Sequence, residues 1–88
     1  MNSDSIVKSY VINRLKSLKG RSIPILDLIR DFKAENVLYC VEHGQRGKQW
    51  GRYQEPLYAS HIRTVINTLL NEGDIVRVST GSYAWIRS

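Results

Sequence analysis

The sequence predicts an α+β fold in which three helices are followed by a C-terminal β-hairpin. Apolar residues recur three or four positions apart in three segments of the chain, which is the period of a helix with one buried face. After Gly73 the period changes to two, which is the period of a strand with one buried face. Because no linker or repeat divides the 88 residues, we expect one domain spanning residues 1–88.

The first predicted helix runs from Ser5 to Lys19. One face carries apolar residues at helical spacing, and these are Val7, Val11, Leu15 and Leu18. Ser3 or Asp4 can cap its start, because a short polar side chain accepts a hydrogen bond from the first free backbone N–H groups. Gly20 can adopt the left-handed conformation that ends a helix.

The second predicted helix covers residues 24–35. Its apolar face consists of Ile25, Leu28, Ile29 and Phe32. Pro24 suits a first helical position, since its φ is already helical and its missing N–H would have no partner there. The short segment 21–23 before it can add one or two residues to the edge of a sheet.

A third predicted helix ends at Gly73, a residue that favours helix termination. Its buried face consists of Ile62, Val65, Ile66 and Leu69, and its opposite face carries Ser60, Arg63, Thr64, Asn67 and Asn71. Val76 and Val78 then alternate with polar residues, a turn follows at Gly81, and Tyr83 and Trp85 alternate with Ala84 and Ile86. This pattern predicts a short hairpin.

Residues 60–75 resemble the recognition helix and wing of winged helix-turn-helix DNA-binding proteins. The resemblance rests on Ile62, Ile66, Leu69, Glu72-Gly73 and Ile75, spaced as an apolar stripe, a turn and the start of a strand. It implies a winged helix of three helices plus a C-terminal β-hairpin wing, with the third helix in the DNA major groove. This chain departs from the family in an atypical long insertion between the second and third helices, at about residues 37–56.

The insertion permits more than one local structure. Residues 37–41 are β-prone but could equally prolong the second helix, and residues 44–52 form a loop or the tip of a hairpin. Loops longer than about 12–15 residues are usually functional or disordered. Because three cations and two aromatic residues gather between positions 46 and 53, we expect a functional arm at residues 44–53.

The positive charge of the chain is unevenly distributed. Its formal net charge is +5, and no acid lies between Ser5 and Leu26 or between Glu42 and Glu55. Two basic regions of this kind indicate a polyanionic partner, most simply nucleic acid. A solvated basic surface without a partner is the alternative.

Three groups of residues are candidates for DNA contact. On the third helix they are Ser60, His61, Arg63, Thr64 and Asn67; on the arm and wing Arg46, Lys48, Trp50, Arg52, Arg77 and Arg87; near the first helix Lys16, Lys19 and Arg21. Arg can donate to two acceptors of guanine, and Asn can pair with adenine in the major groove. Aromatic rings and cations on the arm suit a nucleic-acid strand.

The sequence leaves a structural role open for the same residues. The polar face of the third helix can be an ordinary solvated face, and Ser60 can cap that helix. Arg77 and Arg87 can form ion pairs within the chain. Trp50 and Tyr53 can instead cover a small core.

No catalytic or metal-binding motif is present in the sequence. Cys40 and His43 have the spacing of half a zinc site, but only His61 remains as a further soft ligand. The chain has no nucleophile motif and no phosphate-binding loop. We therefore predict no enzymatic activity, no cofactor and no metal, and we expect Cys40 to be a free, buried thiol.

The predicted function is sequence-specific binding of double-stranded DNA by a transcriptional regulator, as a homodimer. The alternative is a winged-helix module that docks onto proteins of a replication, transcription or viral assembly. Tyr83 and Trp85 on the last strand are expected to pack in the core, with a dimer contact as the alternative. The absence of a signal peptide or long apolar segment, together with a single cysteine, predicts a cytoplasmic protein that does not contact membranes.

Overall fold

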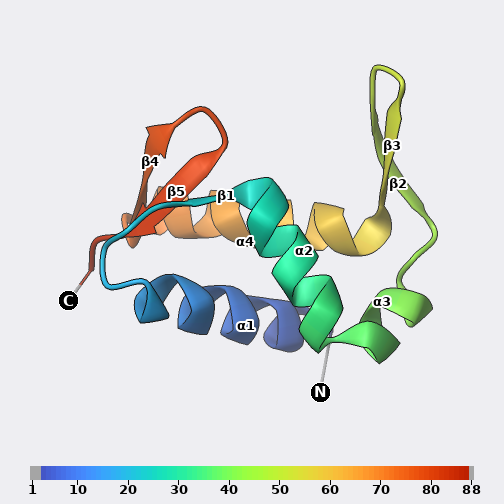
Figure 1. The fold of residues 1–88 in the computed structure, drawn as a ribbon, viewed down its shortest axis with the longest axis horizontal. Helices are drawn as coiled ribbons and strands as arrows, with labels where there is room; N and C mark the ends of the chain where they lie inside the picture. The colour runs from blue at the N-terminus through green and yellow to red at the C-terminus, as the bar shows by residue number, and fades with distance from the viewer. Residues whose placement is uncertain (1–2, 88) are drawn as a thin grey trace.

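The computed structural model describes residues 3–87, apart from the side chains of Ser3, Asp4 and Trp50. The elements are α1 (Ser3–Ser17), β1 (Ile23–Pro24), α2 (Ile25–Glu35), α3 (Val37–Glu42), β2 (Arg46–Trp50), β3 (Tyr53–Pro56), α4 (Leu57–Glu72), β4 (Ile75–Ser79) and β5 (Ser82–Trp85). The α+β class is therefore confirmed (Figure 1). The expected number of three helices is wrong, because the described residues form four.

The helix α1 forms where the sequence predicts it. Its predicted stripe is buried at Val7, Val11 and Leu15, each of which is 0% exposed. The helix ends at Ser17, and Lys19 and Gly20 follow with φ values of 53° and 89°. The chain thus turns through the left-handed conformation at the predicted glycine. Capping by the Ser3 or Asp4 side chain lies outside the described residues.

The helix α2 follows β1 directly. The sequence predicts Pro24 at the first helical position, but Pro24, with φ −64°, lies one position earlier, at the N-cap. Its predicted stripe is buried, as expected, at Ile25, Leu28, Ile29 and Phe32. The short edge strand expected near Ile23 is present as β1 and pairs antiparallel with β5, with Ile23 opposite Tyr83.

Three strands form one antiparallel sheet in the order β1-β5-β4. The strands β4 and β5 are the predicted C-terminal hairpin, which turns at Gly81 with φ 76°. Tyr83 is 8% exposed and joins the core, so the expectation that it packs is confirmed. The sheet therefore joins the segment between α1 and α2 to the C-terminal hairpin.

Residues 37–42 are helical, so the strand expected as one alternative is wrong, but they form a separate short helix, α3, and do not continue α2. Asn36, with φ −133° and ψ 55°, interrupts the helical backbone between α2 and α3. The side-chain amide of Asn36 donates to the carbonyl of Phe32, and its backbone N–H donates to the same oxygen. These bonds end α2 and let the chain start a new helix in another direction.

The arm predicted at residues 44–53 is a second hairpin. The strands β2 and β3 pair antiparallel, with Trp50 opposite Tyr53 and a positive-φ glycine, Gly51, in the turn. Its base is tied to the start of α4, because the N–H of Leu57 donates to the carbonyl of Gln45. The ring of Tyr53 is 50% exposed and does not cover the core.

The helix α4 begins at Leu57 and carries the predicted buried stripe of Ile62, Val65, Ile66 and Leu69. Ser60 lies inside the helix and Pro56 occupies the N-cap position, so the expectation that Ser60 could cap the helix is wrong. At the other end Gly73, with φ 79°, donates its N–H to the carbonyls of Leu69 and Leu70. This is the predicted glycine stop.

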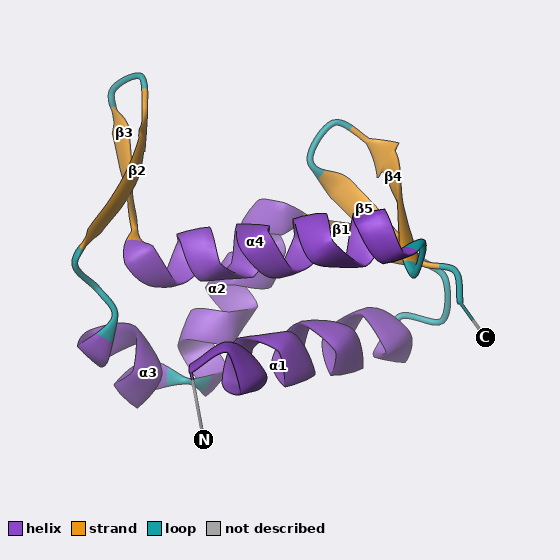
Figure 2. Cartoon of the chain, turned by 180° about the vertical axis from the view of Figure 1, so that it is seen from behind, coloured by secondary structure: helices purple, strands orange, loops and turns teal. Residues whose placement is uncertain are grey.

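The two hairpins stand at opposite ends of α4 and project to the same side (Figures 1 and 2). The hairpin β2-β3 precedes the N-terminus of α4, and the hairpin β4-β5 follows its C-terminus. The helix α1 lies on the opposite side of α4 in both views. One side of α4 is therefore flanked by a hairpin at each end.

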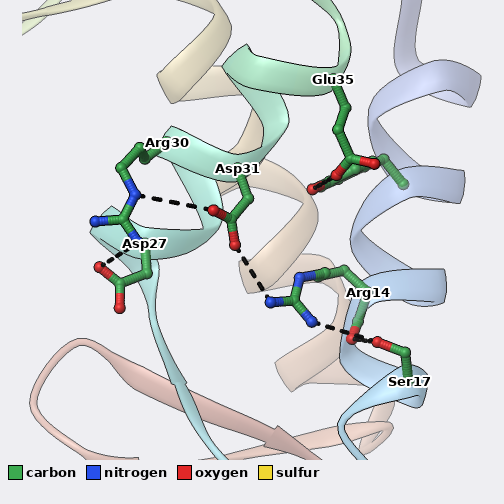
Figure 3. Close-up of polar contacts among 7 residues, drawn as sticks. Arg14, Ser17, Asp27, Arg30, Asp31 and Glu35 are labelled. Carbon is green, nitrogen blue, oxygen red and sulfur yellow. Dashed lines mark hydrogen bonds and ion pairs between the residues drawn. The ribbon is translucent and has the colours of Figure 1, made fainter.

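Polar contacts join α1 to α2 (Figure 3). Arg14 donates through Nη2 to Asp31 at 3.3 Å, and Asp31 also pairs with Arg30 of its own helix. Tyr10 donates its hydroxyl proton to Glu35 at 2.6 Å. These contacts hold α1 against α2 through side chains at the surface. Within residues 3–87, no helix is long and apolar enough to cross a membrane.

Candidate nucleic-acid interface

The polar face of α4 borders a small hollow that the arm completes. The hollow has a volume of about 210 Å³ and is lined by Lys48, Glu55, Ser60, Arg63, Thr64 and Asn67. Four of these residues belong to α4 and two to the hairpin β2-β3. The structure thus brings together four of the five predicted helix residues and one predicted arm residue, Lys48.

Arg63 and Glu55 form an ion pair in this hollow. The Nε–H of Arg63 donates to both carboxylate oxygens of Glu55, each at 3.0 Å. The Glu55 side chain is 0% exposed, whereas that of Arg63 is 28% exposed. The hydroxyl of Ser60 also donates to Glu55 at 3.5 Å. The carboxylate therefore fixes the direction of the Arg63 side chain and offsets part of its charge.

Sequence reasoning missed Glu55. A signal was available, because Glu55 is the sole acid between Glu42 and Glu72, in a stretch that otherwise carries only cations. It also lies eight residues before Arg63, at the end of a strand that leads into the helix. An isolated acid next to a predicted recognition helix is a candidate partner for its arginine.

A glycine allows the arm to lie close to α4. A Cβ on Gly47 would lie 3.0 Å from the hydroxyl oxygen of Ser60 and 3.0 Å from the backbone oxygens of Glu55 and Pro56. Any larger residue would therefore push β2 away from the helix. This contact holds Lys48, the next residue along β2, at the edge of the hollow.

Two threonine hydroxyl groups on α4 bond within the helix. Thr64 donates to the carbonyl of Ser60 at 3.0 Å, and Thr68 donates to the carbonyl of Thr64 at 3.1 Å. Their oxygens remain able to accept hydrogen bonds, and the methyl group of Thr64 is available for apolar contact. Asn67 is exposed on the same face.

His61 lies on another side of α4 from Arg63. Its Nδ1 is 2.9 Å from the hydroxyl of Tyr39 on α3, and its ring lies 5.7 Å from that of His43. It lines a separate hollow with Lys8, Thr64, Val65 and Thr68. Within the described residues, His61 therefore links α4 to α3, and Thr64 is the residue common to both hollows.

The cations of the arm are exposed. Arg46 begins β2, Lys48 lies within it, and Arg52 lies in the turn before β3. The hairpin that carries these three residues projects on the side of α4 that lies away from α1 (Figures 1 and 2). The side chain of Trp50 lies outside the described residues.

The predicted cations of the wing region have partners in the chain. The guanidinium of Arg77 lies 5.9 Å from the centre of the Tyr83 ring. Arg87 donates to Asp74 at 2.6 Å, and this hydrogen bond raises the pKa of its guanidinium. The ion pair that the sequence left open for Arg87 is present, although 64% of its side chain remains exposed.

The three candidates near α1 lie elsewhere. Lys16 and Lys19 line a hollow with Gly20, Trp85, Ile86 and Arg87, and the ammonium of Lys16 lies 5.1 Å from the centre of the Trp85 ring. Arg21 donates to the backbone carbonyl of Leu18. This hollow shares no lining residue with the one beside Arg63.

Cys40 is free and buried, as the sequence predicts. Burial raises the pKa of its thiol, so the thiolate is disfavoured. Among the described side chains, no group of three or more His, Cys, Asp or Glu residues could hold a metal ion.

Comparison with known proteins identifies no relative. The chain matches no protein-family model. It also matches no curated protein and no solved structure. The contacts described above are therefore the basis on which its function is inferred.

Proposed function

We propose that this chain is a winged helix-turn-helix domain that binds double-stranded DNA in a sequence-specific manner as a transcriptional regulator. In this proposal α4 lies in the major groove, the hairpin β4-β5 is the wing, and the hairpin β2-β3 is a basic arm on the backbone. The helix α3 and the arm are the insertion that distinguishes the chain from a simple winged helix.

One observation carries the proposal. Two hairpins project from the ends of α4 to the same side, and the arm contributes Lys48 to a hollow whose other walls include the polar face of α4. An α-helix with its side chains is about 10–12 Å across, which fits the major groove of about 12 Å. A helix flanked in this way suits a groove bordered by two phosphate backbones.

The order of the elements supports the same proposal. Apart from the insertion of α3 and the arm, the order is a helix, a short edge strand, a helix, the helix α4 and a hairpin, and the edge strand pairs with the last strand. In a helix-turn-helix protein, base contacts come from the recognition helix, and backbone contacts fix its position. Asn67 and Thr64 are the side chains best placed for base edges, and Arg46, Lys48 and Arg52 for phosphates.

The test is a fluorescence anisotropy titration of a labelled mixed-sequence duplex at several salt concentrations. Each phosphate contact adds about −0.9 to the slope of log affinity against log salt, so binding through the three arm cations predicts a slope steeper than about −2.7. The variant in which Gln replaces Arg46, Lys48 and Arg52 should lose this part of the slope.

Selection of binding sites from random duplexes tests sequence specificity. A preferred site supports base contact by α4, whereas salt-dependent binding without preference indicates backbone contact alone. Absence of DNA binding would contradict the proposal and favour the alternative of a protein-docking module. That alternative draws support from the exposed apolar residues of α3, which are considered next.

A further inference from the structure

The helix α3 exposes most of its apolar side chains. Val37, Leu38 and Val41 are 58%, 78% and 74% exposed, although the helix has only six residues. Its other face is buried through Tyr39 and Cys40. A helix that is apolar on both sides is typical of one that packs on a second surface.

An apolar groove lies beside these residues. It has a volume of about 580 Å³ and is lined by Arg30, Lys33, Ala34, Val37, Cys40, Val41, Gly44, Pro56 and Tyr58. The side chains of α2 form one wall and those of α3 the other. Leu38 does not line this groove, so its exposed side chain is available to enter the same groove of another molecule.

We propose that α3 and this groove form the two-fold interface of a homodimer, in which Leu38 of each copy enters the groove of the other. A two-fold interface must be self-complementary, since the same surface serves both partners. Here a projecting apolar residue and an apolar groove lie side by side on one surface. This is the arrangement that a two-fold axis between them requires.

The charges around the groove complement one another in the same way. Lys33 is exposed on the α2 wall, and Glu42 is exposed at the end of α3. When α3 of one copy lies in the groove of the other, Glu42 of the first approaches Lys33 of the second. The two-fold axis repeats this pair, so the proposed interface contains two of them.

The position of α3 also fits DNA binding by two copies. The molecule is 35 Å along its longest axis, and α3 lies at one end of that axis, opposite the hairpin β4-β5 (Figure 1). Two copies that meet end to end through α3 would have centres about 35 Å apart, and half-sites on one face of DNA lie about 34 Å apart. This spacing argument rests on the proposed function, whereas the dimer itself does not.

Sedimentation equilibrium without DNA tests the dimer. Between about 1 µM and 1 mM of chain, we expect the mass to approach twice the 10.1 kDa of one copy. Leu38→Asp should weaken the dimer at least about tenfold, because a carboxylate would replace an apolar side chain in the groove. Leu26→Asp is the matched control, since Leu26 is likewise exposed, at 61%, but lies in the first turn of α2, at the end of that helix away from α3.

A charge exchange tests the register of the interface. Lys33→Glu and Glu42→Lys should each weaken the dimer, and the double variant should restore it. A chain that remains monomeric at 1 mM, or a dimer equally stable in Leu38→Asp and Leu26→Asp, would overturn the proposal. Binding of single half-sites by the Leu38→Asp monomer separates failure of the dimer from failure of DNA binding.

Discussion

Arg63 on α4 and Glu55 at the end of β3 join the helix to the arm through two hydrogen bonds of 3.0 Å from one Nε–H group. Because Glu55 is fully buried, the contact has a structural role in addition to any role in DNA binding. A substitution of Arg63 should therefore alter both the stability of the protein and the polar face of α4. Base recognition is therefore better tested at another residue of the same face.

Breaking the ion pair should destabilise the protein. Arg63→Gln leaves the buried carboxylate of Glu55 without its charged partner, and we expect a loss of about 3 kcal/mol in the free energy of unfolding, measured by urea denaturation. The double variant with Glu55→Gln should lose less than the sum of the single variants. Additive losses would show that the two side chains do not interact in solution.

Asn67→Ala is the cleaner test of base recognition, since Asn67 is exposed on the same face. We expect affinity for a selected site to fall by about 1–3 kcal/mol and preference to relax at one base pair. Affinity for mixed-sequence DNA should change little. An equal loss on both duplexes would indicate a phosphate contact for Asn67.

The arm cations should contribute more to the salt dependence than those near α1. Replacing Arg46, Lys48 and Arg52 with Gln should reduce the salt slope by about 3. The same replacement of Lys16, Lys19 and Arg21 should reduce it by no more than about 2, because Lys16 and Lys19 border a different hollow and Arg21 donates to the backbone carbonyl of Leu18. Equal reductions would show that DNA contacts both regions.

Gly81→Val should destabilise the wing hairpin, because φ is 76° at this turn and a β-branched residue is strained there. We expect a loss of about 1 kcal/mol or more, measured as a lower melting temperature. Thr80→Val is the matched control in the same turn. A similar melting temperature for both variants would contradict the role assigned to Gly81.

Stability should fall at alkaline pH. Burial raises the pKa of Tyr10, with a further contribution from its hydrogen bond to Glu35, and burial also raises the pKa of Tyr58. The folded protein thus favours the neutral phenols, so their stabilisation is complete below the pKa of about 10 in the unfolded chain and is lost as pH rises above it.

Denaturant titrations between pH 8 and pH 11 measure this loss. Tyr10→Phe should remove part of the pH dependence, and Tyr58→Phe should remove a further part. An unchanged slope in Tyr10→Phe would show that its hydrogen bond to Glu35 does not govern the alkaline transition.

The helices and turns that short sequence patterns specify could be predicted from the residues alone. Helical periodicity identifies the buried stripes of α1, α2 and α4, since one helix face must lie against the core. Gly73 and Gly81 mark a helix end and a turn because both positions have positive φ, where a Cβ is disfavoured. These are local constraints, and they can be inferred before the fold is known.

Which charged residues form ion pairs depends on how the helices and hairpins pack, and the sequence did not predict it. The stretch from Ser5 to Leu26 contains no acid, yet Arg14 pairs with Asp31 of the next helix and Lys8 lies 4.0 Å from Glu72 of α4. The same is true of Arg63 and Glu55, which join a helix to a hairpin. Such pairs join residues distant in sequence, so they depend on how helices and hairpins pack and leave no periodic pattern in the chain.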